Sequence, residues 1–255
     1  MTSPIGIVDS GVGGLSIFQA IEEKLPHEDI LYFADTAHFP YGERTNAEIL
    51  RFATQITAFL FTQNVKLLII GSHSISATCL QNLQRAFPLP ILGMTTPTIN
   101  AIAQTTKNKR IGILATQATL RSNIYQNAIP GAITYPLTCP ELKEKVELSD
   151  PNTQATIQAC TAPLLGQEID TLLLACTHYP HLKGAIEEEL DPGTVVLNPA
   201  LSVAASAKDM LKDPQNKKHS PQHTFYVSGD IAPFQSFLEK HPPKAPYEIR
   251  HENFA

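Results

Sequence analysis

The chain has 255 residues, which is enough for one large α/β domain or two smaller ones with their own hydrophobic cores. With 43% hydrophobic residues, 17% charged residues and a formal net charge of −5, the composition fits a globular protein and does not indicate binding to nucleic acid or a membrane surface. No apolar run approaches a membrane span, and the N-terminus lacks the regions of a signal peptide. Four cysteines without a CxxC pair argue against a zinc knuckle or a disulfide framework, so we expect a reduced, cytoplasmic protein.

A glycine-rich turn follows the first predicted strand. The apolar run Ile5–Val8 predicts a buried strand, and a helical periodicity extends from Leu15 to Leu25. Between them lies Asp9–Gly14, DSGVGG, whose backbone N–H groups can approach an anion at the start of the helix. A tight turn without any ligand is the alternative.

A dinucleotide site is a second alternative for this turn. Asp35 follows the predicted strand Ile30–Phe33 at about the spacing that a dinucleotide fingerprint requires. However, Ser16 stands where the third glycine of that fingerprint should be. The sequence therefore disfavours a nucleotide site.

The next segments form a loop and a helix. Proline and glycine punctuate the loop Phe39–Glu43, in which Tyr41 either offers a phenol to a substrate or covers the core. Apolar residues at helical spacing predict an amphipathic helix from Asn46 to Gln63.

A third strand, Lys66–Ile70, ends in the polar run GSHSIS at residues 71–76, and we expect a helix from about Ala77. A short strand at Pro88–Gly93 and a helix at Thr95–Thr106 follow. The second half of the chain opens with the strand RIGIL at residues 110–114.

Two apolar strands of the first half recur in the second half. IGIV at residue 5 resembles IGIL at residue 111, an offset of 111 − 5 = 106, and LIIGS at residue 68 resembles LLLAC at residue 172, an offset of 172 − 68 = 104. Nearly equal offsets predict two similar lobes whose strand tips face each other across a cleft. Ser72 and Cys176 would then occupy equivalent places, although short apolar strands can also resemble each other by chance.

The second half alternates further strands and helices. Thr116 or Thr119 is expected to cap a helix after RIGIL, and Glu147 ends a charged helical segment in which most carboxylates are solvated. Later segments are predicted as helices at Asn152–Leu165, after Pro180-His181 (carrying Ile186 to Leu190) and at Ala200–Leu211, strands at Val195–Leu197 and from Phe225, a polar linker at Pro214–Gln222, and a polar tail.

The stretch Leu172–Pro180, LLLACTHYP, is the strongest candidate for the chemistry. Its apolar start predicts a buried parallel strand, and ligands bind beyond the carboxyl ends of such strands. Cys176 would stand at the strand tip beside Thr177 and His178. The alternative is that Cys176 is one more small buried residue.

Six motifs spread over nearly the whole chain resemble those of the glutamate racemases in the aspartate/glutamate racemase superfamily. They are DSGVGG (9–14), DT (35–36) with PYG (40–42), LATQATLRSNIY (114–125), CP with a later glutamate (139–147), ACTHYP (175–180) and FYVSGD (225–230). The resemblance implies an α/β fold of two similar lobes, each a mostly parallel sheet flanked by helices. The lobes would comprise residues 1–95 plus 208–255 and residues 96–207, with the active site in the cleft between them.

The resemblance also implies a function. It predicts a racemase that interconverts L- and D-glutamate without a cofactor or metal, and supplies D-glutamate for peptidoglycan in the cytoplasm. Racemases with two lobes often pair, so a homodimer is expected, although no sequence feature marks an interface. The catalytic residues implied are Cys176, Ser72, His73, Asp9, His178 and Glu147. The substrate-binding residues implied are Asp9, Ser10, Pro40, Tyr41, Gly42, His73, Ser74, Thr119, Thr177 and His178.

One departure from the family pattern affects the mechanism. Where the family has Cys-Asn-Thr, this chain has Ser72-His73-Ser74. Racemisation without a cofactor needs a base on each face of the α-carbon, and a serine hydroxyl acts as one only with an adjacent base. His73 is the evident candidate, either activating Ser72 or taking the proton itself. Two alternatives remain: one-sided proton chemistry of the kind that a single-thiol decarboxylase performs, or a catalytically weak relative that binds a ligand or a partner.

Overall fold

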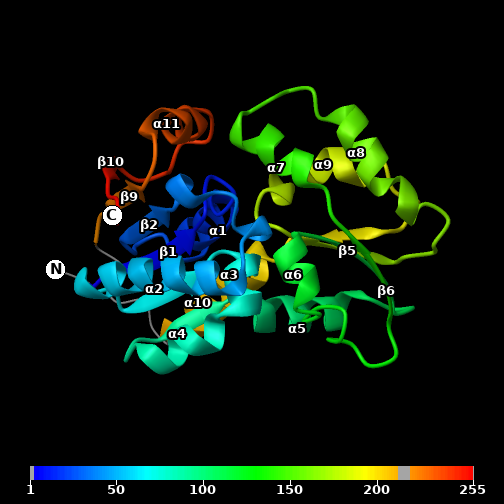
Figure 1. Ribbon diagram of the computed structural model, residues 1–255, viewed down its shortest axis with the longest axis horizontal. Helices are drawn as coiled ribbons and strands as arrows, with labels where there is room; N and C mark the ends of the chain where they lie inside the picture. The colour runs from blue at the N-terminus through cyan, green and yellow to red at the C-terminus, as the bar shows by residue number, and fades with distance from the viewer. Residues whose placement is uncertain (1–2, 212–218, 255) are drawn as a thin grey trace.

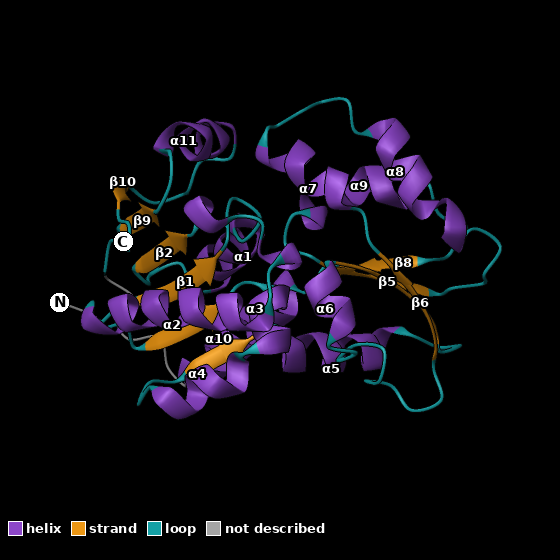
Figure 2. Cartoon of the chain, viewed as in Figure 1, coloured by secondary structure: helices purple, strands orange, loops and turns teal. Residues whose placement is uncertain are grey.

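Two parallel β-sheets form the framework of the protein, whose computed structural model describes residues 3–211 and 219–254. The first sheet has the strand order β10-β9-β2-β1-β3-β4 and the second β6-β5-β7-β8 (Figures 1 and 2). The strands are β1 (Ile5–Asp9), β2 (Ile30–Ala34), β3 (Leu67–Ile70), β4 (Ile91–Gly93), β5 (Arg110–Ala115), β6 (Ile133–Leu137), β7 (Thr171–Ala175), β8 (Val195–Leu197), β9 (His223–Val227) and β10 (Tyr247–His251).

Helices cover both faces of each sheet. They are α1 (Leu15–Lys24), α2 (Asn46–Thr62), α3 (His73–Thr78), α4 (Leu80–Ala86), α5 (Thr95–Thr105), α6 (Gln117–Arg121), α7 (Pro140–Glu147), α8 (Gln154–Thr161), α9 (Lys183–Glu187), α10 (Ala200–Leu211) and α11 (Ile231–Lys240). Short 3₁₀ turns η1 (Thr36–His38), η2 (Tyr41–Glu43), η3 (Ala162–Leu164) and η4 (Tyr179–Leu182) complete the chain. None of the described helices is both long and apolar enough to cross a membrane.

The strand order confirms the internal repeat. β2-β1-β3-β4 of the first sheet corresponds to β6-β5-β7-β8 of the second, and every pairing between neighbours is parallel. β3 and β7 therefore hold equivalent positions, and Ser72 and Cys176 follow them at equivalent tips. The division at residues 95 and 207 stays a prediction, since α10 continues past residue 207 while it packs on α1 and α5.

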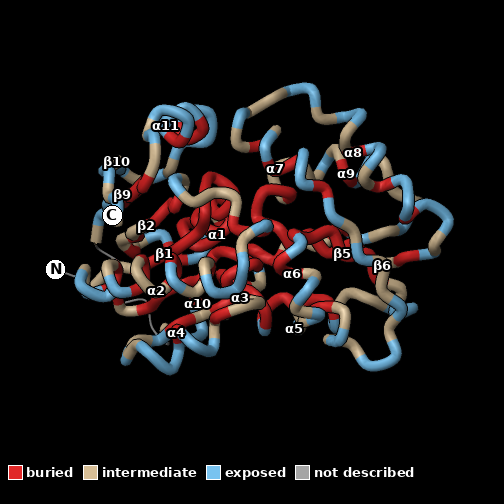
Figure 3. The backbone as a smooth tube through the Cα atoms, viewed as in Figure 1, coloured by how far each residue is buried: buried red, intermediate tan, exposed pale blue. Residues whose placement is uncertain are grey.

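Burial on both faces explains why the central strands read as continuous apolar runs. β1, β3 and β7 are buried along their whole length. One face of the first sheet packs against α1, α10 and α11, and the other against α2, α3 and α4. Buried chain runs through both sheets in Figure 3, whereas exposed segments lie on the outer helices and loops.

The C-terminal segment corrects the expectation of a polar tail. α11 buries Phe234, Phe237 and Leu238 in the core of the first sheet, and Asp230 caps its start by accepting a hydrogen bond from the N–H of Ala232. β10 pairs in parallel with β9 at the sheet edge, and none of its side chains is fully buried. An exposed edge strand carries no apolar run, so hydrophobic patterning does not reveal it.

Several other expected boundaries shift. α3 begins at His73 rather than near Ala77, because Ser72 caps it, and a separate helix α4 follows. The helix expected over residues 152–165 is shorter and ends in a 3₁₀ turn, and α9, expected after His181 and through Leu190, spans Lys183–Glu187. Edge strand β6, which contains a proline, was not among the expected strands. Residues 212–218, in and just before the expected linker, lie outside the described residues.

Candidate active site

A small pocket lies between the two sheets, where the carboxyl ends of four strands meet. β1, β3, β5 and β7 each contribute the side chain that follows them closely, namely Ser10, Ser72, Thr116 and Cys176. Ser72, His73 and Cys176 line this same pocket, as the repeat predicts. The other predicted site residues that line it are Pro40, Tyr41, Gly42, Ser74, Thr177 and His178.

Cys176 lies at one end of a hydrogen-bonded chain. Its sulfur is 3.6 Å from Nδ1 of His178, and Nε2 of that ring is 2.7 Å from Oε1 of Glu147. The same carboxylate oxygen accepts a hydrogen bond of 2.9 Å from the backbone N–H of Val12. Cys176 and His178 are both buried, so this series of hydrogen bonds holds the imidazole in one orientation against the sulfur.

The surroundings of His178 favour its charged form. Burial alone would lower the pKa of His178, but the hydrogen bonds to Cys176 and Glu147 and the charges of these two groups raise this pKa to about 10. His178 is therefore an imidazolium near neutral pH, with both ring N–H groups donating. A cation beside a cysteine stabilises the thiolate, which is the nucleophilic and basic form of the side chain.

The glycine-rich turn after β1 binds an anion that belongs to the protein itself. The Val12 N–H that points at Glu147 is the backbone donor expected of such a turn. A Cβ added at Gly11 would lie 2.2 Å from Oε1 of Glu147, and one at Gly13 would lie 2.5 Å from Nδ1 of His178. Glycines are required here because α7 and the residues after β7 approach the turn so closely.

Asp9 lies behind the pocket lining. Its carboxylate accepts hydrogen bonds of 3.1 Å from the N–H of Gly11 and from the hydroxyl of Thr177, which joins the two lobes. Burial raises the pKa of Asp9 to about 6, although the charge of His178 and the hydrogen bonds oppose this shift. Asp9 therefore changes from a neutral carboxyl group to a carboxylate near pH 6, which lies within the usual pH range of an enzyme assay.

The opposite wall of the pocket carries Ser72 and His73. Ser72 Oγ accepts a long hydrogen bond of 3.4 Å from the N–H of Ile75, so the hydroxyl caps α3. Nδ1 of His73 lies 2.7 Å from the hydroxyl of Tyr125, and burial lowers the pKa of His73 to about 3, so the ring is neutral. Within the described residues no hydrogen bond joins the side chains of Ser72 and His73, so activation of the serine by this histidine lacks the contact it needs.

The loop between β2 and α2 is held by a buried carboxylate. Tyr41 donates its phenolic hydrogen to Asp35, and Ser228 donates to the other oxygen of Asp35 at 2.6 Å. The phenolic hydrogen of Tyr41 is therefore engaged with Asp35, while Tyr41 also lines the pocket, and its contact with substrate stays a prediction. The DT, PYG and SGD motifs thus belong to one network that shapes the pocket wall.

Thr116 is the helix cap that the sequence left undecided between two threonines. Its hydroxyl accepts a hydrogen bond from the N–H of Thr119 and lies 2.9 Å from the hydroxyl of Ser74 on α3. Thr119 is fully buried behind it, 3.0 Å from Thr116 Oγ1, and does not line the pocket. A direct contact of Thr119 with substrate stays a prediction.

Three lining residues were not among the predicted site residues: Phe39, Thr116 and Lys143. Lys143 lies in the charged helical segment that ends at Glu147, and nothing in such a segment distinguishes an inward lysine from a solvated one. Helical spacing from Glu147 offers one signal, because residues four apart share a helix face.

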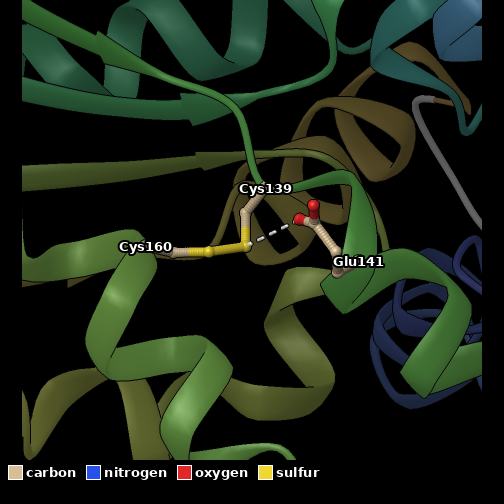
Figure 4. Close-up of side chains that lie close together, drawn as sticks. All are labelled: Cys139, Glu141 and Cys160. Atoms are coloured by element: carbon tan, nitrogen blue, oxygen red, sulfur yellow. Dashed lines mark hydrogen bonds between the residues drawn. A yellow bond between two sulfur atoms is a disulfide. The ribbon is translucent and has the colours of Figure 1, made fainter.

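Two of the four cysteines form a disulfide, which corrects the expectation from their spacing. Cys139, at the start of α7, is bonded to Cys160 on α8, and Glu141 lies close to the pair (Figure 4). The two sulfurs are joined to each other and so do not act as separate thiolate ligands for a metal. Cys79 and Cys176 are free, and burial raises the pKa of Cys79 to about 11, which makes it an inert core residue.

The fold and the pocket are those of a two-lobed α/β protein that carries a thiol, an imidazolium and carboxylates between its sheets. The family model of the Asp/Glu/Hydantoin racemases matches residues 5–207, and the chain belongs to this family. Among similar sequences, the glutamate racemase of Picosynechococcus is 39% identical over 89% of this chain and 84% of its own length. That of Levilactobacillus brevis is 32% identical over 99% of this chain and 95% of its own.

Solved structures of the family superpose on nearly the whole chain. A glutamate racemase from Bacillus anthracis has a TM-score of 0.90 at 31% identity, and covers 99% of this chain and 97% of its own. A glutamate racemase from Francisella tularensis in complex with D-glutamate has a TM-score of 0.87 at 29% identity with the same coverage. The predicted α/β fold of two sheets flanked by helices is confirmed.

Proposed function

We propose that the protein interconverts L- and D-glutamate by removing the α-proton on one face and returning a proton on the other, without a cofactor. One observation carries this proposal: Cys176 and the pair Ser72 and His73 approach a single pocket from equivalent strand tips of the two lobes. Relatives of 32–41% identity that carry the name glutamate racemase support glutamate as the substrate.

The thiolate of Cys176 would act on one face of the substrate. It accepts the α-proton, so that the C–H bond breaks, an S–H bond forms, and the electron pair moves into the substrate carboxylate as an enolate. His178 remains an imidazolium beside the sulfur, held by Glu147. The hydroxyls of Ser10 and Thr177, the second of which is held by Asp9 behind the lining, supply acceptors for the substrate ammonium group.

We assign the proton transfer on the other face to His73. Its Nδ1 is engaged with Tyr125, so Nε2 is the nitrogen that exchanges a proton with the α-carbon. In one direction the neutral Nε2 accepts the α-proton and the Cys176 thiol returns a proton from the opposite face. In the reverse direction the Cys176 thiolate accepts the α-proton and the Nε2–H of the His73 imidazolium returns one. A neutral ring whose pKa burial lowers to about 3 is a weaker base than a thiolate. We therefore expect the enantiomer whose α-hydrogen faces Cys176 to exchange its proton faster than its mirror image.

One-sided chemistry is the second candidate function, because the chain has one thiol at the site where the family motif has two. Incubation of the purified protein with L- or D-glutamate in D₂O separates the possibilities. Deuterium incorporation with inversion supports racemisation, and Cys176→Ala should abolish it. Incorporation with retention, or turnover of a malonate-like substrate, supports one-sided chemistry. Binding without any exchange identifies a ligand-binding relative. Undiminished inversion by Cys176→Ala would show that the chemistry lies elsewhere.

We infer a cellular role from the proposed reaction. D-Glutamate is a building block of peptidoglycan, so we place the enzyme in the cytoplasm, supplying cell-wall precursors. We also propose a homodimer, which light scattering coupled to size-exclusion chromatography tests directly. A mass of 27.9 kDa in solution would identify a monomer and reject the dimer.

A further inference from the structure

Lys143 is a buried cation in the wall of the pocket. It lies on α7, its side chain is 6% exposed, and it lines the same pocket as Cys176 and Ser72. Among the described residues that line this pocket, it is the one lysine or arginine. Lysine is rarely buried to this degree without a charged partner or a charged ligand.

The ion pair that Lys143 makes in the structure is weak. Lys143 Nζ lies 3.2 Å from Oε1 of Glu43, which belongs to η2 of the first lobe and is 61% exposed. An exposed carboxylate keeps most of its hydration, so an ion pair with it contributes little. Glu43 can leave the ammonium at small cost when another carboxylate arrives.

The Lys143–Glu43 pair lies where the pocket meets an adjoining one. Lys143, Gly42 and Thr116 line both pockets and Glu43 lines the adjoining one, whereas Cys176 and His73 line the first pocket alone. A substrate with its α-carbon between Cys176 and His73 could direct its longest substituent toward the lysine and the adjoining pocket.

We propose that Lys143 binds the side-chain carboxylate of the substrate, taking the place of Glu43, and so selects amino acids with an acidic side chain. This inference rests on the proposed function and names the group that reads the substrate side chain. The other polar groups of the lining are mainly hydroxyls, which bind a carboxylate and an amide alike. A lysine ammonium distinguishes them, because a charge-assisted hydrogen bond is about twice as strong as a neutral one.

Calorimetric titration with D-glutamate and with D-glutamine, its uncharged isostere, tests the proposal. Lys143→Met should weaken glutamate binding roughly 10-fold to 100-fold and leave glutamine binding nearly unchanged. Lys143→Arg should restore most of the preference for glutamate, and Glu43→Gln should tighten glutamate binding. Lys145→Met is the matched control, because Lys145 lies on the same helix but pairs with Asp150 outside this pocket.

The outcomes separate this inference from the proposed function. An equal loss of glutamate and glutamine affinity in Lys143→Met would overturn the inference, as would a preference that Lys145→Met removes equally. If glutamate binds with the predicted preference but is never inverted, the proposed function fails and the inference stands. If KM for glutamate is unchanged in Lys143→Met and only kcat falls, the lysine does not select the side chain.

Discussion

At the residue scale, the site depends on how burial divides charge among a few groups. Both His178 and His73 are buried histidines beside strand tips, yet they differ in charge. The hydrogen-bond partners of His178 keep it charged, whereas burial keeps His73 neutral. The difference comes from Glu147 and Cys176, which contact one ring, while a tyrosine contacts the other. The sequence marked both histidines, but their protonation follows from contacts made by distant segments.

Asp9 should control the acidic limb of the activity profile. Its pKa is raised to about 6, so kcat/KM for glutamate should rise with pH up to about 6 and then level off, as the carboxylate forms. Because the pKa of Asp9 is higher in the folded state than in the unfolded state, the folded state binds a proton at Asp9 more tightly. The contribution of Asp9 to stability is therefore full below its ordinary pKa of 3.8 and is lost as pH rises through about 6.

Asp9→Asn keeps the shape of the side chain and removes its titration. Initial rates measured from pH 5 to pH 8 should show the limb near pH 6 in the unmodified protein and a flat or displaced profile in the variant. An identical limb in both proteins would mean that another group titrates there.

Gly13→Ala should disturb the site without replacing a catalytic side chain. The new Cβ would lie 2.5 Å from Nδ1 of His178 and 2.7 Å from Oγ1 of Thr177, so His178 must move away from Cys176. A misplacement of about 1 Å can cost roughly 100-fold in rate, and we expect a fall in kcat/KM of that order. Gly184→Ala is the control, since a Cβ there meets nothing within 4 Å. Equal rates in the two variants would contradict the close approach.

At the element scale, α7 carries a carboxylate of the catalytic chain, the proposed specificity lysine and, at its start, one half of the disulfide. It places Lys143 in the pocket wall and Glu147 beside His178, and its start is tied to α8 by the disulfide (Figure 4). Tyr179, which follows His178, donates a hydrogen bond of 3.1 Å to the carbonyl of Cys139 at the start of this helix. Contacts at both ends of α7 therefore fix its position relative to α8 and to His178.

Cys160→Ser tests how much the disulfide contributes. The bond closes a loop with a sequence separation of 21, for which chain entropy predicts a stabilisation of about 3 kcal/mol. The variant should lose roughly that amount of unfolding free energy in urea under oxidising conditions. The two proteins should converge when a reductant is present. A difference that persists in reductant would assign the effect to packing instead.

The elements show where hydrophobic patterning succeeds and where it fails. β1, β3 and β7 were predictable because burial on both faces makes them continuous apolar runs. β6 and β10 were not, since both are edge strands with exposed side chains. The start of α3 was missed because a capping serine at a strand tip reads equally well as a loop.

At the scale of the whole molecule, the sequence repeat predicted the feature that matters most. Matching strands at nearly equal offsets placed Ser72 and Cys176 at equivalent tips, and the two tips line one pocket. Lys143 and the Cys139–Cys160 pair were beyond prediction, because they depend on how α7 packs between the lobes and against α8. Such contacts join segments far apart in the chain and leave no periodic signal.

The most direct test follows α-proton exchange of L- and D-glutamate separately in D₂O, in the unmodified protein, in Cys176→Ala and in His73→Gln. Because the two groups lie on opposite sides of the α-carbon, each should remove the α-proton from a different enantiomer. We predict that Cys176→Ala abolishes the faster exchange of one enantiomer and that His73→Gln abolishes the slower exchange of the other. Loss of exchange from the same enantiomer in both variants would place the two groups on one side and contradict the mechanism.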